Sequence, residues 1–474
     1  MCRNVIEKCL VSLCLVLLAS PSFASNKPNV VYVLVDNWGW GDISLQGGTV
    51  PTPRIEELAA AGTRFTNFNV QNQCTPTRSA IHTGRLPIRS GTQKVPAPGE
   101  PQGMAPWEYT IAELLSDSGY ATAMYGKWHI GDKDGRLPND QGYDEWYGTK
   151  ESAMEASYTS TPQFDPEVFD IPHIWAGKKG EPSKKVKEFD LESRALLDGE
   201  IVAKTSAFIR KQARADRPFY IYAALTQIHP PFLPHPDLVD ASGAGEYADI
   251  QMQVDHYVGQ IMDAIESAGV ADNTILILTG DNAAGEASTG WGGEGGSNGP
   301  WRGGLSTGYE GGIRTPGMIR WPKNIPAGKV TDEIVSDLDW MPTIANLVGE
   351  ENRIPSDRPI DGINQADFIL GKQEKSDREY IVTYVGDNVF SVKWRTLKVH
   401  FYTAEGTFSQ IKQPTFPSVF DIKNDPGETR ELFAAEGYAH LWVTKPVMDI
   451  LTGLAISMNQ YPNIKPGEDF KGYE

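Results

Sequence analysis

Cysteine is scarce in this chain. It has four cysteines in 474 residues, and three of them, Cys2, Cys9 and Cys14, lie within the first fourteen positions. Those three fall inside a segment with the features of a cleaved export signal, so Cys74 would be the only cysteine of the mature protein. A single cysteine cannot form an intramolecular disulfide, which excludes a disulfide framework. A lone thiol in an exported protein makes Cys74 a candidate functional residue.

Long apolar runs are missing after the N-terminus. There, Arg3 and Lys8 precede an apolar stretch at 9–19 and small residues at 22–24, which predicts a signal peptide over residues 1–24. The stretch is too short to favour an anchor, and no later segment approaches the roughly 20 apolar residues that a span needs. We therefore expect a soluble protein without a membrane span, located in the periplasm or secreted.

Positive charge is also in short supply. Lysine and arginine number 43 against 61 aspartates and glutamates, which gives a formal net charge of −18. Such an acidic chain is a poor candidate for binding nucleic acid or an anionic membrane. A small anionic substrate is still compatible with this charge, because a local cationic pocket can outweigh distant, screened charges.

The apolar residues that are present predict an α/β fold. Four buried strands are expected at 29–35, 120–125, 218–225 and 274–278. Helical patterns lie between them, at 53–62, 110–119, 190–214 and 246–268. This alternation predicts a mostly parallel sheet flanked by helices. The polar segment 151–187 is interpreted as an insertion loop.

The pattern changes near residue 377, where short alternating runs begin. The runs at 380–384, 390–394 and 396–402 predict an antiparallel sheet. The expected organisation is therefore a catalytic domain at 25–376 and a smaller C-terminal α+β subdomain at 377–474.

Polar residues follow each of the four predicted strands. They are Asp36 and Asn37, Lys127 and His129, His229, and Asp281 and Asn282. Ligands bind at the carboxyl ends of strands in open α/β sheets, so these residues are expected to converge on one site. The four Asp and Asn side chains offer hard oxygen ligands, which suit calcium or magnesium rather than zinc. Asx residues also cap loops, but two such pairs at two strand ends favour a metal site.

Residues 74–85 (CTPTRSAIHTGR) resemble the modification signature of the type I sulfatases, Cys-x-Pro-x-Arg followed by Thr-Gly-Arg. Further matches occur in the family's order at 28–42, 126–131 (GKWHIG), 229–231 (HPP), 279–282 (TGDN), 298–305 (NGPWRGGL), 310–316 (EGGIRTP) and 418–428. The resemblance implies the alkaline-phosphatase-like fold and an arylsulfatase-like sulfuric ester hydrolase.

The resemblance also implies how the site works. Cys74 would be oxidised by a formylglycine-generating or equivalent maturation enzyme, and the hydrated aldehyde would attack the sulfur of a small sulfated substrate. Arg78, on a helix expected at 77–83, would hold the hydrate. Calcium, or alternatively magnesium, would be bound by residue 74 with the four Asp and Asn side chains named above.

The same resemblance assigns roles to the remaining polar residues. Lys127 would bind sulfuryl oxygens, His229 would protonate the leaving alcohol, and His129 would deprotonate the hemiacetal. Asp281 would assist the attacking hydroxyl. Taken one at a time, each histidine is more often structural.

Two positions depart from the family pattern. Asn37 stands where a second aspartate is usual, and Leu305 where a sulfate-binding lysine is usual, so one lost anion and one lost cation can compensate. Two alternatives stay open: a phosphonate monoester or phosphodiester hydrolase, and a non-catalytic sulfate-ester binding protein. Selection of the alcohol half is expected to lie in segment 151–187, the glycine-rich segment 285–312 and the C-terminal subdomain.

Overall fold

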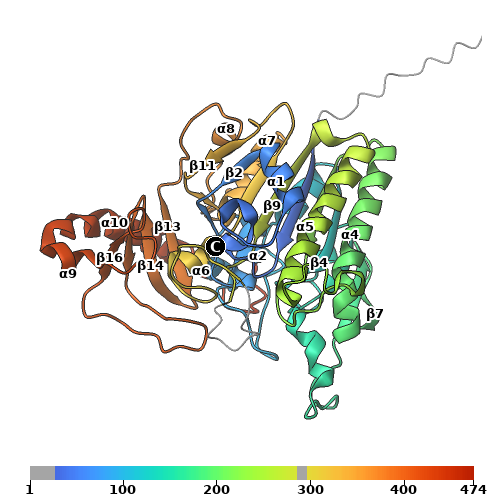
Figure 1. Ribbon diagram of the computed structural model, residues 1–474, viewed down its shortest axis with the longest axis horizontal. Coiled ribbons are helices and arrows are strands. Elements are labelled where there is room, and N and C mark those ends of the chain that lie inside the picture. The colour runs from blue at the N-terminus through green and yellow to red at the C-terminus, as the bar shows by residue number, and fades with distance from the viewer. Residues whose placement is uncertain (1–26, 286–295, 474) are drawn as a thin grey trace, which may run out of the picture.

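A computed structural model describes residues 27–285 and 296–473 (Figure 1). The predicted signal peptide and part of the glycine-rich segment lie outside these residues. The described chain forms a large sheet with helices on both faces and, at one side, a separate small sheet followed by the C-terminal helices.

The large sheet has ten strands, in the order β11-β2-β10-β9-β1-β8-β4-β5-β6-β7. Its five central strands are parallel. The strands of this sheet are β1 (Asn29–Val35), β2 (Thr63–Phe65), β4 (Ala121–Lys127), β5 (Glu145–Thr149), β6 (His173–Lys178), β7 (Lys184–Glu188), β8 (Phe219–Ala224), β9 (Thr274–Gly280), β10 (Gly317–Arg320) and β11 (Lys329–Thr331). The prediction of a mostly parallel sheet is confirmed.

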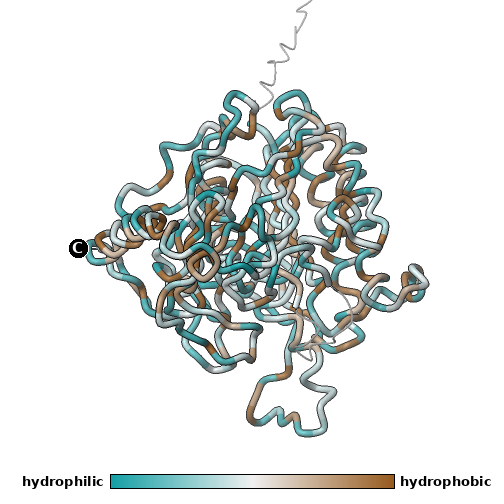
Figure 2. The backbone as a smooth tube through the Cα atoms, turned by 60° about the vertical axis from the view of Figure 1, so that its left-hand side comes forward, coloured by the Kyte–Doolittle hydropathy of each residue, from teal (hydrophilic) through white to brown (hydrophobic). Residues whose placement is uncertain are grey.

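Helices cover both faces of this sheet because alternate side chains of its buried strands point to opposite sides. In β1, Val31 and Val33 belong to one core with α1, α4 and α5, whereas Tyr32 and Leu34 belong to the other with α2, α3 and α7. The helices are α1 (Pro53–Ala60), α2 (Cys74–Thr83), α3 (Ile111–Asp117), α4 (Leu191–Arg214), α5 (Glu246–Ser267), α6 (Glu310–Ile313), α7 (Trp340–Leu347), α8 (Ala366–Ile369), α9 (Leu432–Glu436) and α10 (Thr444–Gln460). Hydrophobic stretches run through the middle of the molecule (Figure 2).

The segment 151–187 is only partly the loop that its composition predicts. Its first part contains a 3₁₀ helix, Ala153–Ser160, and its last part supplies β6 and most of β7. These two strands extend the sheet in antiparallel fashion beyond β5. Lysine-rich edge strands such as β7 (KKVKE) lack a buried face, which is why the strand pattern is missing from the sequence.

The C-terminal part contains a second sheet, in the order β13-β14-β15-β16, with antiparallel pairing throughout. Its strands are β13 (Tyr380–Val385), β14 (Asn388–Trp394), β15 (Leu397–His400) and β16 (Ser418–Asp421). A two-stranded pair, β3 (Phe68–Asn69) with β12 (Val335–Ser336), completes the described strands.

One helical stretch, Leu432–Gln460, has the length and mean hydropathy of a membrane span, which differs from the sequence-based expectation. It is divided into α9, a 3₁₀ segment and α10. Val443 and Val447 of this stretch are buried in the core of the small sheet. Length and composition alone are weak evidence for a span.

Candidate active site

Cys74 lies at the start of α2, where the carboxyl ends of the central strands meet. The helix begins at Cys74 itself, with Gln73 as the N-cap, rather than at Thr77 as predicted. Pro76 is compatible with this earlier start because first-turn N–H groups have no acceptor within the helix. The side chain of residue 74 is therefore at the positive end of a ten-residue helix.

The thiol of Cys74 faces the loop after β1, which contains the predicted metal ligands Asp36 and Asn37. Its Sγ lies 3.5 Å from Oδ1 of Asp36 and 4.0 Å from Oδ1 of Asn37. Burial raises the pKa of the Cys74 thiol well above its ordinary value, and Asp281 and Asp36 raise it further. A thiol that stays protonated is a poor nucleophile, so this environment favours chemistry by a modified residue 74 rather than by a thiolate.

Two buried cations hold the two carboxylates of the site. Lys127 Nζ donates to Asp36 Oδ2 at 2.6 Å, and Arg78 Nη2 donates to Asp281 Oδ2 at 2.8 Å. All four side chains are fully buried. Burial opposes ionisation of Asp36, but Lys127, His229 and Arg78 outweigh it and lower its pKa. Burial and the nearby Asp36 raise the pKa of Asp281 to about 6, which marks it as the carboxyl short of positive charge.

Asn37 and Asn282 link the loop after β1 to the loop after β9, the two loops that contain predicted metal ligands. Asn282 Nδ2 donates to Asn37 Oδ1 at 2.5 Å, and the backbone N–H of Asn37 donates to Asp281 Oδ1 at 3.1 Å. Asn37 has a positive φ of 56°, an uncommon conformation that turns the chain sharply after β1. Asn282 Oδ1 is buried and accepts no hydrogen bond within the described residues. This oxygen-rich set fits a hard divalent cation.

The two histidines approach residue 74 from different strands. His229 Nδ1 donates to the carbonyl of Pro230 at 2.6 Å, which leaves Nε2 as the proton-exchanging nitrogen, 3.4 Å from Ser152 Oγ. One ligand atom each from Asp36, Cys74 and His229 lies within 4.8 Å of the others. Burial and Lys127 lower the pKa of His229 to about 4.

His129 is held in a strained position beside the same site. Its φ is 61°, and its side chain is buried with Nδ1 lacking a partner among the described residues. Its Nε2 lies 4.0 Å from Glu151 Oε2. Burial, followed by Lys127, holds its pKa well below the ordinary value, so His129 is neutral and able to accept a proton.

A cavity of about 330 Å³ opens above residue 74. It contains Cys74, His129, His229 and Leu305, together with parts of the three segments expected to contact the alcohol half. Three polar lining residues lie outside the predicted site residues and segments: Gln73, Gln102 and Asp132. Ser152, Glu155 and Ser306 lie within the predicted segments but were not predicted individually. The polar pair at 151–152 comes just after β5, so the strand-end rule that found the other residues could have found this pair.

Other residues of the matched motifs shape the backbone. Gly84 ends α2 in the left-handed conformation with φ 64°. Arg85 lies away from residue 74, 3.5 Å from Glu108 and 3.0 Å from the Tyr473 hydroxyl. In β4, a Cβ on Gly126 would lie 1.8 Å from the carbonyl oxygen of Ala224, so only glycine allows this close strand pairing.

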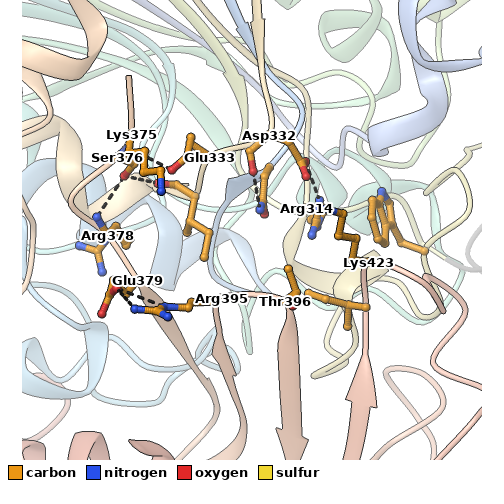
Figure 3. A pocket seen from close by; sticks show the side chains of 14 residues that line it. Arg314, Asp332, Glu333, Lys375, Ser376, Arg378, Glu379, Arg395, Thr396 and Lys423 are labelled. Carbon is orange, nitrogen blue, oxygen red and sulfur yellow. Dashed lines mark hydrogen bonds and ion pairs between the residues drawn. The ribbon is translucent and has the colours of Figure 1, made fainter. Parts of the chain in front are cut away.

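A second cavity, of about 420 Å³, lies beside the small sheet and contains none of the predicted site residues (Figure 3). Several of its charged side chains pair with protein groups, among them Arg395 with Glu379 at 2.6 Å and Arg378 with buried Asp339. Arg314 lies over the ring of Trp301 at 3.8 Å. This cavity therefore belongs to the packing between the two sheets.

Known protein families and relatives match most of this chain. The family model described as Sulfatase matches residues 28–350, and the model described as N-sulphoglucosamine sulphohydrolase, C-terminal, matches residues 306–450. N-acetylgalactosamine-6-sulfatase of Canis lupus familiaris is 32% identical over 88% of this chain and 84% of its own. Arylsulfatase A of Homo sapiens is 32% identical over 88% of this chain and 86% of its own.

Among solved structures, the PsFucS1 sulfatase from Pseudoalteromonas sp. superposes with a TM-score of 0.85 and 30% identity, covering 93% of this chain and 92% of its own. The chain belongs to the sulfatase family. It is an enzyme that hydrolyses sulfate esters, which confirms the prediction of a sulfuric ester hydrolase and of the alkaline-phosphatase-like fold. These three relatives are all sulfatases, which weighs against the phosphonate or phosphodiester hydrolase and the non-catalytic alternative.

Proposed function

We propose that Cys74 is converted to formylglycine and that this residue is the nucleophile. The observation that supports it is the buried, protonated thiol at the start of α2, 3.5 Å from Asp36, in a chain of the sulfatase family. In the conversion a maturation enzyme supplies an oxidant such as dioxygen. Cβ gives two electrons to that oxidant: the C–S bond breaks, the sulfur leaves as hydrogen sulfide, and a C=O bond forms with one oxygen atom from the oxidant.

We propose that Asp36, Asn37, Asp281 and Asn282, with an oxygen of modified residue 74, bind calcium; magnesium is the alternative. The buried Asn282 Oδ1 without a partner among the described residues and the raised pKa of Asp281 both support a cation at this place. The donors are all oxygen once the thiol is replaced. When bound, the ion supplies positive charge beside the sulfuryl oxygens.

The proposed reaction uses the two histidines at different steps. Water adds to the aldehyde, and one hydroxyl of the resulting diol attacks the ester sulfur while Asp281 accepts its proton. The S–O bond to the alcohol breaks as His229 gives the leaving oxygen a proton, and sulfate stays bound to residue 74. His129 then removes the proton of the remaining hydroxyl, the C=O bond re-forms and sulfate leaves.

In this scheme, substrate binding promotes the protonation of His229. The free enzyme holds His229 neutral, because burial and Lys127 lower its pKa to about 4. A bound sulfate ester adds negative charge near its ring, which favours the imidazolium. Lys127 and Arg78 stay charged throughout and hold the sulfuryl group and the diol.

The remaining assignments complete the proposal. Export to the periplasm or secretion follows from the signal-peptide pattern at residues 1–24. The partners are a small sulfated substrate and the maturation enzyme, with no nucleic acid and no membrane span. We place the catalytic domain at 25–376 and the C-terminal subdomain at 377–474.

The proposal is tested with Cys74→Ala and Cys74→Ser, each produced with a formylglycine-generating system. Both variants should lose hydrolysis of 4-nitrophenyl sulfate, since neither can form the aldehyde by that system. The control is Ser79→Ala, which changes a buried hydroxyl on the same helix without removing the thiol. Full activity of Cys74→Ala would overturn the proposal.

A further inference from the structure

The outer part of the active-site cavity has an unusual charge pattern. The side chains of Asp132, Glu151 and Glu155 line it, and no lysine or arginine occurs among its described lining residues. The neighbouring Lys150 is not a lining residue: its Nζ lies 3.8 Å from the centre of the Trp175 ring and donates to the backbone carbonyl of Asp132 at 2.9 Å. The cationic groups of the site, Lys127 and Arg78, lie fully buried beneath the cavity. The described residues that line the cavity thus carry no lysine or arginine, and the two buried cations lie beside residue 74.

These carboxyl groups make few hydrogen bonds with the protein. Asp132 Oδ1 is buried without a hydrogen-bond partner in the described part of the chain. The side chain of Glu155 has no hydrogen bond or ion pair there, and Glu151 accepts one hydrogen bond, from Gln102 Nε2 at 3.0 Å. Carboxyl oxygens that lack protein donors at a cavity wall are suited to accept hydrogen bonds from ligand hydroxyls.

The remaining wall of the outer cavity is apolar and aromatic. Tyr158 and Phe169 pack edge to face with ring centres 5.5 Å apart, and Met154 and Phe408 also line the cavity. A ring with hydroxyls on its edge and C–H groups on its face matches such a wall. An acidic rim together with an apolar platform therefore suits a sugar.

The pKa values of these carboxyl groups indicate that negative charge is unfavourable in the cavity. Burial, together with neighbouring carboxyls, raises the pKa of Glu151 and of Glu155 to about 8, although Lys150 and Lys127 respectively oppose the shift. A carboxyl can relieve this cost by binding a proton. A second sulfate ester on the ligand is a far stronger acid and stays ionised. It is therefore repelled by the ionised carboxylates.

We propose that the outer cavity selects a sugar whose only anionic group is the sulfate that reacts. Asp132, Glu151 and Glu155 accept hydrogen bonds from its hydroxyls, while a second sulfate or a carboxylate is rejected. This inference rests on the proposed function and names the substrate class of that site. Glu155 and Asp132 are specificity residues in this account, because neither contacts the reacting atoms.

The test measures inhibition of 4-nitrophenyl sulfate turnover by the isomeric galactose monosulfates and by galactose disulfates that contain the best of them. Assays are run at about pH 9, where the carboxyls are ionised. The wild type should bind the best monosulfate at least about tenfold more tightly than the disulfate, the scale of one like-charge contact near a protein surface.

Two variants of the cavity wall test the inference more directly than the wild type does. Glu155→Gln and Asp132→Asn should each weaken binding of the monosulfate and strengthen binding of the disulfate, opposite changes that a merely loosened fold would not produce. Glu167→Gln, which changes an exposed carboxyl of the same segment outside the cavity, should leave both unchanged.

Equal or tighter binding of the disulfate by the wild type would overturn the inference. An unchanged ratio in both cavity variants would overturn it as well. Turnover of the aryl sulfate with no binding of any sugar sulfate would overturn it while leaving the proposed function intact. Absence of all sulfatase activity in protein that carries formylglycine would instead refute the proposed function.

Discussion

Arg78 binds a single oxygen of Asp281 with two of its nitrogens, Nε at 3.0 Å and Nη2 at 2.8 Å. Its third nitrogen, Nη1, donates to the carbonyl of Lys127 at 2.5 Å. The guanidinium of Arg78, which lies on the same helix as residue 74, thus links the end of β4 to the residue that follows β9. The other oxygen of Asp281 is left facing the loop after β1.

Arg78→Lys should lower kcat/KM for 4-nitrophenyl sulfate by about 100-fold or more, because an ammonium cannot reproduce the fork of donors. The kinetic constants and the melting temperature are measured together, which separates lost catalysis from unfolding. Arg353→Lys, at an exposed pair with Glu350, should leave both unchanged. A loss below about threefold in Arg78→Lys would contradict the role given to this guanidinium.

Metal removal should abolish activity, and added calcium should restore it. Asp281→Ala should lower the bound metal per chain, since it removes a charged ligand from a set of four oxygen-bearing side chains. Metal analysis provides this readout independently of turnover. The control, Asp272→Ala, changes an exposed residue paired with Lys323. Undiminished turnover by exhaustively chelated protein with no bound metal would refute the assignment.

The central strands can be predicted from the sequence because they are buried on both faces. β1 has the predicted bounds, whereas β4 and β9 each continue two residues further than predicted. Their last residues, Lys127 and Gly280, are polar or small and carry no strand signal. The short strands β2 and β10 escape prediction, since three or four residues have no periodicity and pair only with distant segments.

The centre of the candidate site can be predicted for a similar reason. Parallel strands deliver the residues that follow them to one edge, so Asp36, Lys127 and Asp281 are expected to meet. The outer cavity cannot be predicted in this way. Glu155 lies on the 3₁₀ helix Ala153–Ser160 and Phe169 in the turns that follow it, and the path of both depends on packing against the rest of the molecule.

The two departures from the family pattern should be energetically coupled. Leu305 lines the cavity, and Asn37 Oδ1 lies 4.0 Å from Cys74 Sγ. Leu305→Lys alone adds a cation, and Asn37→Asp alone adds an anion, so each should impair catalysis. The double variant should recover part of the loss, a coupling of about 0.5–3 kcal/mol in a double-mutant cycle on kcat/KM. Strict additivity would show that the two positions are independent.

Glu310 should stabilise the contact between the two sheets. Its carboxylate, fully buried on α6, accepts hydrogen bonds from Lys393 Nζ of β14 and Lys398 Nζ of β15, each at 2.9 Å. Glu310→Gln leaves buried cations uncompensated and should cost about 3–5 kcal/mol in the free energy of unfolding. Urea unfolding at neutral pH measures it. Glu405→Gln, at an exposed pair with Arg302, should cost less than about 1 kcal/mol.

The sign of the pH dependence follows from the pKa of Glu310. Burial opposes its ionisation, but Lys393 and Lys398 outweigh burial and hold the pKa well below the ordinary value. The stabilisation is therefore fully present above the unfolded pKa of about 4.3 and is lost as the pH falls through the lowered folded value. The gap between wild type and Glu310→Gln should narrow on acidification. A gap that widens would contradict this sign.

The central claim is that residue 74 acts as formylglycine, and mass analysis of one peptide tests it most directly. Trypsin cleavage after Arg64 and Arg78 releases the peptide 65–78, which contains Cys74 and no other cysteine. In active enzyme, made with a competent maturation system, this peptide should carry the mass of the aldehyde or its hydrate, and the converted fraction should rise in proportion to specific activity. Fully active enzyme whose peptide carries only the unmodified thiol would contradict the account.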